Sequence, residues 1–222
     1  MTTAVIGIGH IGEPLARQLA AAGERLILAA DHVAKADALA TELGPLATAA
    51  PVRKAIADAD VIVFAVPFET IEQLIRENAD LLPDKVVIDP SNAMRPDGNG
   101  GFVRSLPDGQ SAGATIAALL PARSHFVKAF GTLSAGSLAS GANRKPERAV
   151  LFYATDDPRA ALAAERLIAA AGFDPVKANG VRSSARIEML GDLHEFGGLH
   201  GKLLTTREAV DALAWNRKEK GL

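Results

Sequence analysis

Three glycines, Gly7, Gly9 and Gly12, form the pattern G-x-G-x-x-G directly after an apolar run at residues 3–6. A helical spacing of apolar residues follows, and this order of strand, turn and helix is typical of a dinucleotide-binding turn. The first glycine permits the bend, the second lets the backbone approach a diphosphate, and the third lets the helix pack on the strand. We therefore expect a dinucleotide to bind along Gly7, Ile8, Gly9, His10, Ile11 and Gly12. The alternative is a domain of the same fold that has lost its ligand.

Asp31 lies 19 residues after Gly12, at the end of an apolar run that we predict to be the second strand. A carboxylate at this point can accept hydrogen bonds from the adenosine ribose, which favours NAD. His32 and Lys35 are close enough in sequence to offer positive charge to the 2′-phosphate of NADP. Asp31 could equally cap the helix that follows. These residues leave the choice between NADP and NAD open.

Further candidates lie where three later predicted strands end, at residues 66, 88 and 130. Ligands of open α/β sheets bind at the carboxyl edge of the strands, so side chains that follow these strands are candidates for binding. Turn formation and solvation of strand ends are the alternative explanations. The residues expected at this edge are Val66, Pro67 and Phe68 beside the nicotinamide, and Ser91, Asn92, Lys128 and Thr132 beside a substrate or second cofactor.

His194 lies in a C-terminal stretch that also contains Glu195 and His200. The spacing of the two histidines does not place both rings on one helix face, and two glycines lie between them, so we expect no metal site. We expect His194 to line a pocket for substrate or second cofactor. No residue pattern indicates a catalytic acid or base, and catalytic residues are left unassigned.

The elements that must position these residues alternate between strands and helices. Such an alternation predicts an α/β protein with a Rossmann-type, doubly wound, mainly parallel sheet. Later strands continue the pattern more weakly, and we expect them in the same sheet. Expected strands are residues 3–6, 26–30, 61–66, 86–88, 126–130, 149–153 and 175–177; expected helices are 14–22, 33–43, 70–81 and 158–171.

Two segments interrupt this alternation. Residues 89–113 are rich in Gly, Pro, Asp and Asn without a sustained period, and we expect a long loop. After residue 178 the pattern indicates helices at 183–193 and 206–215. We therefore divide the chain into a dinucleotide-binding domain, 1–178, and a short helical C-terminal appendage, 179–222, that contributes to a substrate pocket and a subunit contact.

Composition excludes several functions. The 222 residues contain 24 Lys and Arg, 26 Asp and Glu and no cysteine, with a formal net charge of -2. The scattered basic residues do not form a nucleic-acid-binding patch, and thiol chemistry and disulfides are excluded. No apolar run reaches the length of a membrane span. We expect a cytoplasmic, unprocessed protein that binds small molecules, with no nucleic-acid or membrane partner.

Several segments together resemble the family of NADPH-dependent F420 reductases and their bacterial relatives. They are VIGIGHIGEPLARQLAAAG at the start, FAVPFETI, VVIDPSNAM, KAFGTLSAG, and DLHEFGGLHGKLL near the end. The resemblance spans most of the chain. It implies that NADP lies across the Gly-rich turn, with the nicotinamide near Val66-Pro67-Phe68 and the deazaflavin F420 stacked against it. Direct hydride transfer between stacked rings needs orientation and exclusion of water more than side-chain chemistry.

We interpret the chain as an NAD(P)-dependent oxidoreductase that transfers hydride between a nicotinamide cofactor and a second cofactor, F420 being possible, or a small acceptor. We expect it to form a homodimer through its helical tail. One alternative is a reductase of an imine, flavin or carbonyl-like acceptor. The other is a binding module that senses the nicotinamide redox state without turnover.

Overall fold

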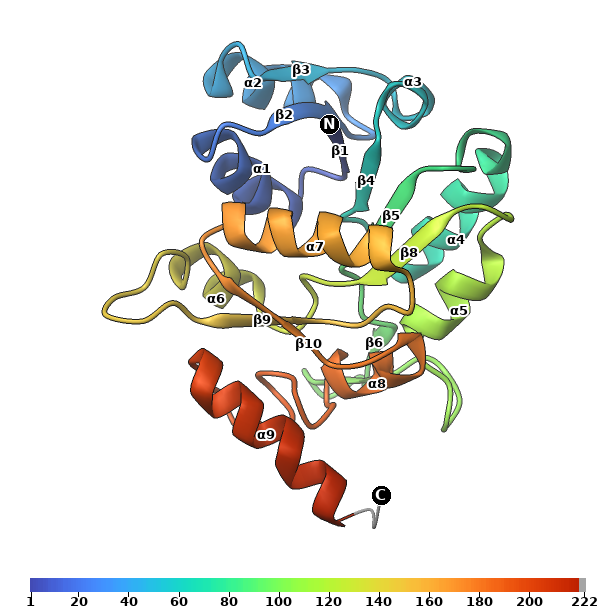
Figure 1. Cartoon of the computed structure of the whole chain (residues 1–222). Coiled ribbons are helices and arrows are strands. Elements are labelled where there is room, and N and C mark those ends of the chain that lie inside the picture. Colours follow the sequence, from blue (N-terminus) through green and yellow to red (C-terminus); the bar gives the residue numbers. More distant parts are fainter. Residues whose placement is uncertain (220–222) are drawn as a thin grey trace.

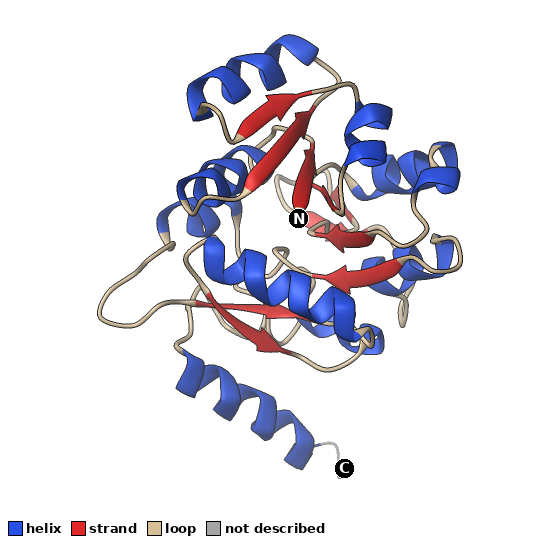
Figure 2. Ribbon diagram, turned by 45° about the horizontal axis from the view of Figure 1, so that its top comes forward, coloured by secondary structure: helices blue, strands red, loops and turns tan. Residues whose placement is uncertain are grey.

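The computed structural model describes residues 1–219 and centres on a six-stranded parallel sheet in the order β3-β2-β1-β4-β5-β8. Helices cover both faces of this sheet (Figures 1 and 2). The predicted Rossmann-type parallel sheet is thus confirmed. Its strands are β1 (Thr2–Ile6), β2 (Arg25–Ala29), β3 (Ala47–Ala49), β4 (Val61–Phe64), β5 (Val86–Asp89) and β8 (His125–Lys128).

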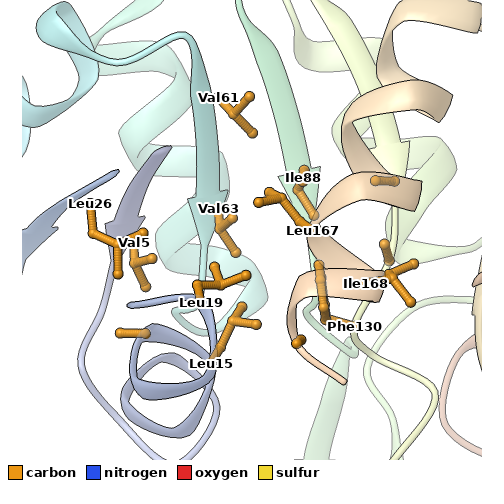
Figure 3. Close-up of a cluster of buried hydrophobic side chains, with 14 of the residues drawn as sticks. Val5, Leu15, Leu19, Leu26, Val61, Val63, Ile88, Phe130, Leu167 and Ile168 are labelled. Carbon is orange, nitrogen blue, oxygen red and sulfur yellow. The ribbon is translucent and has the colours of Figure 1, made fainter. Parts of the chain in front are cut away.

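Alternate side chains of each central strand enter two different cores. Val61 and Val63 of β4 join one buried cluster, whereas Ile62 and Phe64 join the other. The period of two in a strand produces this division, and it explains why β4 is apolar at every position. Figure 3 shows Val61 and Val63 on the same side as Leu15 and Leu19 of the first helix.

The two cores are closed by different helices. On one face lie α1 (Gly12–Ala21), α2 (Val33–Leu43) and α7 (Pro158–Ala170). On the other lie α3 (Val52–Asp58), α4 (Phe68–Glu77) and α5 (Ala112–Leu119), and a short 3₁₀ turn, Ala79–Leu81, follows α4. The sequence missed β3 and α3, because strand β3 has three residues and no alternating pattern. This omission matters for the site, since α3 forms part of a cavity wall.

The last predicted strands do not extend the main sheet, so that expectation is wrong. Strands β9 (Val150–Tyr153) and β10 (Asp174–Lys177) pair in parallel with each other as a separate two-stranded sheet. An isolated antiparallel bridge between Lys128 and Ala154 links this sheet to the end of β8. The reversed direction at that bridge prevents β9 from continuing the parallel ladder.

Two further predictions need correction. The expected loop at 89–113 contains an antiparallel hairpin of β6 (Met94–Pro96) and β7 (Phe102–Arg104). The expected helix at 183–193 ends early: a 3₁₀ turn, Val181–Ser183, and α8 (Ser184–Ile187) lead into turns. Leu190 has φ 70°, which no α-helix allows, and the Glu188 carboxylate folds back to the start of α5. Tertiary contacts therefore override the helical pattern here.

The remaining C-terminal elements follow the expectation more closely. Helix α6 (Ala135–Ser140) follows β8, and α9 (Thr206–Glu219) matches the predicted helix at 206–215. Glu208 accepts from the Thr205 N–H at 2.9 Å, while Thr205 Oγ1 accepts from the Glu208 N–H, a capping box that sets the start of α9. The division of the chain into a domain, 1–178, and an appendage, 179–222, stays a prediction. The last residues of the appendage, 220–222, lie outside the described residues.

None of the helices in residues 1–219 is both long enough and apolar enough to cross a membrane.

We expect Leu19→Ala to lower the free energy of unfolding by about 3 kcal/mol, because a cavity would replace a side chain packed between α1 and the sheet. Leu19 is 0% exposed, whereas Leu162 of α7 is 70% exposed and provides the matched control. Leu162→Ala should stay within about 0.5 kcal/mol of the parent. Urea unfolding measures both; equal effects would contradict this description of the core.

Candidate active site

The turn after β1 is held by two glycines for which no other residue fits. Gly7 has φ +96°, and a Cβ there would lie 2.4 Å from the Ala65 carbonyl oxygen. A Cβ on Gly12 would lie 1.8 Å from the Gly7 carbonyl oxygen. The Gly7 N–H donates to the Ala29 carbonyl at 2.8 Å, which joins the turn to the end of β2. Gly7 is therefore required by its positive φ and by the segment after β4, and Gly12 by the close approach of α1 to the end of β1.

Gly9 differs from these two glycines. A Cβ on Gly9 would meet no atom of the described chain within 4 Å, so its missing side chain leaves open space. The adjacent start of α1 has no side-chain hydrogen-bond cap among residues 1–219. Uncapped N–H groups and the positive end of a helix dipole attract phosphate. The residues therefore fit a dinucleotide diphosphate at this turn.

A cavity of about 570 Å³ opens beside Gly9 at the carboxyl edge of β1, β2 and β4. It brings together most of the predicted cofactor residues and adds apolar side chains from α3 and α4. The lining comprises Ile6, Gly7, Ile8, Gly9, Ala30, Asp31, His32, Lys35, Val52, Ala65, Val66, Pro67, Thr70 and Leu74. Val52 and Leu74 were missed by sequence reasoning; the apolar face of α4 was a signal for Leu74, but no motif marks Val52.

Four of the predicted cofactor residues lie outside this lining: His10, Ile11, Gly12 and Phe68. Phe68, the first residue of α4, is 5% exposed and packs in the core between α4 and the sheet. His10 lines a second cavity of about 640 Å³, which lies between α1 and α6 and also contains Gly9 and Lys35. The two cavities thus meet at the Gly-rich turn.

Asp31 is exposed directly after β2, and one of its carboxylate oxygens, Oδ1, accepts from the His32 N–H at 2.9 Å. The N-cap of α2 is His32, and within the described chain this helix has no side-chain cap. Asp31 therefore does not act as the N-cap residue that the sequence left as an alternative. Lys35 Nζ lies 3.9 Å from a carboxylate oxygen of Glu13, the first-turn acid of α1.

The ends of β5 and β8 are joined by a buried ion pair. Lys128 Nζ lies 2.8 Å from Asp89 Oδ2, and the side chains are 1% and 0% exposed. Lys128 also donates to the Ser91 carbonyl, while Asp89 Oδ1 accepts from the Ser91 N–H at 2.7 Å. These contacts hold the loop after β5 and give Lys128 a structural role. Whether it also contacts a ligand stays a prediction.

Asn92 links that loop to two other segments. Its amide donates to the Gly131 carbonyl at 3.1 Å, and its side-chain oxygen accepts from the Met189 N–H at 2.6 Å. The nearby hydroxyls of Ser91 and Thr132 are buried and have no hydrogen-bond partner among the described residues. Buried hydroxyls without partners are costly, and they indicate a place where a ligand or water completes the bonding.

His194 is 3% exposed, and its Nδ1 accepts from the Phe196 N–H at 2.9 Å. Burial lowers the pKa of the His194 imidazole, against smaller raising effects of Glu195 and the Gly131 backbone. The ring is therefore neutral at neutral pH, with its proton on Nε2. It lies beside Gly131 and Thr132, close to the other predicted acceptor residues.

Two carboxylates that the sequence did not single out for this purpose hold the C-terminal segment. Glu188 accepts from the N–H groups of Ala112 and Gly113 at the start of α5, at 3.1 and 2.8 Å. Glu195 accepts from the Ser134 N–H and the Ser137 hydroxyl at the start of α6, both at 2.6 Å. Acidic side chains are favourable at helix N-termini, so this segment is fixed over the carboxyl edge of the sheet.

A parallel sheet with a Gly-rich diphosphate turn defines the class of dinucleotide-binding α/β folds. Within that class, residues 2–93 match the family described as NADP oxidoreductase, coenzyme F420-dependent. The resemblance drawn from sequence segments is thus confirmed for the part of the chain from β1 to the loop after β5. Comparison with curated proteins gives no match.

Solved structures share the fold over most of the chain. A hypothetical protein of Sinorhizobium meliloti is 27% identical with a TM-score of 0.80, covering 93% of this chain and 96% of its own. A candidate F420-dependent NADP reductase of Arthrobacter is 20% identical with a TM-score of 0.71, covering 82% and 86%. A reductive aminase of Aspergillus terreus, in complex with NADPH and ethyl levulinate, is 20% identical with a TM-score of 0.62; the match covers 83% of this chain and 56% of the aminase. The matched family and the two named enzymes are oxidoreductases.

We expect Lys128→Met to lower the free energy of unfolding by about 3 to 5 kcal/mol, because Asp89 would remain buried without its partner. Lys54→Met is the matched control: Lys54 also pairs with an aspartate at 2.8 Å, but on the surface of α3. Its effect should be about 0.5 kcal/mol or less. Urea unfolding distinguishes the two variants; equal losses would mean that the buried pair does not stabilise this edge.

His194 makes stability depend on pH. Because its folded-state pKa is lowered, the unfolded protein binds more protons below about pH 6.5, and stability falls as the pH falls. We expect His194→Asn, which keeps a hydrogen-bond acceptor, to weaken the loss of unfolding free energy between pH 7 and pH 5. His200→Asn is the control, since His200 is exposed. An unchanged pH dependence in His194→Asn, measured by urea unfolding, would rule out this role.

Proposed function

We propose that this chain is an oxidoreductase that transfers hydride between a nicotinamide dinucleotide and a second cofactor or small acceptor. The observation that carries this proposal is the turn at Gly7, Gly9 and Gly12. Packing requires Gly7 and Gly12, while Gly9 leaves open space beside the uncapped start of α1. If the turn served packing alone, the open space beside Gly9 would not be needed.

The residues that line the cavity support different contacts for the different parts of the dinucleotide. Val52 and Leu74 offer apolar contacts to the adenine, and the amides after Gly9 offer hydrogen bonds to the diphosphate. Val66 and Pro67 also line this cavity, which supports the sequence prediction that the nicotinamide lies beside the Val66–Phe68 segment. The bound nicotinamide supplies or accepts the hydride. The chain orients it and excludes water, which requires no catalytic acid or base.

We infer that the acceptor binds at the carboxyl edge beside Ser91, Asn92, Thr132 and His194. The hydroxyls of Ser91 and Thr132, which find no partner in the described part of the chain, support this location. The description of the matched family supports F420 as the acceptor or donor. The likeness to a reductive aminase and to an imine reductase of Bacillus cereus supports an imine as the alternative. The homodimer and the cytoplasmic location stay predictions.

We expect Gly9→Val to fold normally and to lose at least about tenfold in affinity for NADH and NADPH, because its side chain would occupy the approach of the diphosphate. Gly12→Ala should instead destabilise the protein, since its Cβ would collide with the Gly7 carbonyl. Calorimetric titration and thermal unfolding separate the two effects. Full affinity in a folded Gly9→Val protein would contradict the placement of the cofactor.

Turnover decides between the acceptors. The protein is mixed with reduced nicotinamide cofactor and F420, a flavin or a cyclic imine, and the nicotinamide absorbance is followed. A fall with F420 supports the family activity, and a fall with the imine supports the alternative. Tight cofactor binding without turnover of any acceptor would favour a redox sensor over an enzyme.

A further inference from the structure

We propose that Asp31 selects a dinucleotide with a free 2′-hydroxyl on its adenosine ribose, so that this chain uses NAD(H) in preference to NADP(H). The inference rests on the proposed function, because it assumes that the cavity beside Gly9 holds the adenosine half of the cofactor. It departs from the description of the matched family, which names NADP.

The position of Asp31 places its carboxylate against the ribose. Asp31 follows β2, whose last residue, Ala29, binds the first glycine of the turn through the Gly7 N–H. Asp31 lines the same cavity as Gly9 and is itself exposed. An acidic side chain after the second strand of this fold accepts hydrogen bonds from the ribose hydroxyls.

One oxygen of the Asp31 carboxylate is bound to the backbone, and the other is available to a ligand. Oδ1 accepts from the His32 N–H at 2.9 Å. Oδ2 makes no hydrogen bond to any described residue, so it is available to a ligand hydroxyl. A 2′-phosphate at the same place would bring its negative charge close to Asp31. The two negative charges would repel, so the site would bind a ligand with a free 2′-hydroxyl more tightly than one with a 2′-phosphate.

The nearby positive groups are already engaged. The ammonium of Lys35 lies 3.9 Å from the Glu13 carboxylate, and its side chain is half exposed. The N-terminal end of α2 has no side-chain cap in the described chain, but the Asp31 carboxylate adjoins it and balances its partial positive charge. The remaining candidate for a phosphate contact is the exposed ring of His32. A 2′-phosphate would therefore meet the negative charge of Asp31, and the lysine closest in sequence, Lys35, lies 3.9 Å from the Glu13 carboxylate.

The test uses ADP-ribose and 2′-phospho-ADP-ribose, which contain the adenosine half of the two cofactors and no redox group. Calorimetric titration of the full chain should show ADP-ribose binding at least about tenfold more tightly, equivalent to about 1.4 kcal/mol. NADH and NADPH should show the same order. Because Asp31 is exposed, the preference should shrink when salt is raised from 0.05 to 0.5 M.

Asp31→Asn removes the charge and keeps a hydrogen-bond acceptor. We expect it to raise affinity for the phosphorylated ligand and to reduce the preference to about threefold or less. The matched control is Asp37→Asn, which removes the same charge from an exposed site on α2 away from the cavity lining. Asp37→Asn should change the preference less than twofold.

The outcomes separate this inference from the proposed function. Tighter binding of 2′-phospho-ADP-ribose to the parent protein would overturn the selectivity alone, and would assign the phosphate to His32 and Lys35. An equal change of preference in Asp31→Asn and Asp37→Asn would also overturn it, since only overall charge would then matter. Binding of neither ligand, nor of NADH or NADPH, would overturn the proposed function as well.

Discussion

The close approach of α1 to the end of β1 is the constraint on which the site depends. The Gly12 backbone lies so near the Gly7 carbonyl that no side chain fits between them. This contact directs the start of α1 at the carboxyl edge of the sheet, where the helix dipole and the free N–H groups are most useful to an anion. The cavity beside Gly9 exists because helix and strand meet at this angle and distance.

A second constraint works on the opposite half of the sheet. The buried pair of Asp89 and Lys128 joins β5 to β8 and holds the loop that carries Ser91 and Asn92. Asn92 in turn binds the segment after α8, which Glu188 and Glu195 tie to two helix N-termini. Contacts between residues as far as 97 positions apart therefore form one edge. Polar contacts among buried groups fix this arrangement, because each unsatisfied partner would be costly.

The two halves explain why the site needs few reactive side chains. One half offers backbone amides, an apolar wall and an acidic residue, all suited to a dinucleotide. The other offers a neutral imidazole and two hydroxyls that have no hydrogen-bond partner among residues 1–219. Hydride transfer depends on the relative placement of two bound rings, so the fold contributes chiefly geometry.

The sequence by itself determined the parallel sheet and the Gly-rich turn, because periodic apolar runs and a short motif are local signals. Tertiary structure alone decided that β9 and β10 form their own sheet, that the segment after α8 leaves the helix, and that Lys128 is buried against Asp89. Val52 joined the cavity because α3 packs against β1 and β2 at this edge of the sheet. These outcomes depend on contacts between residues far apart in the chain, and neither propensity nor spacing records which distant partner a side chain will meet.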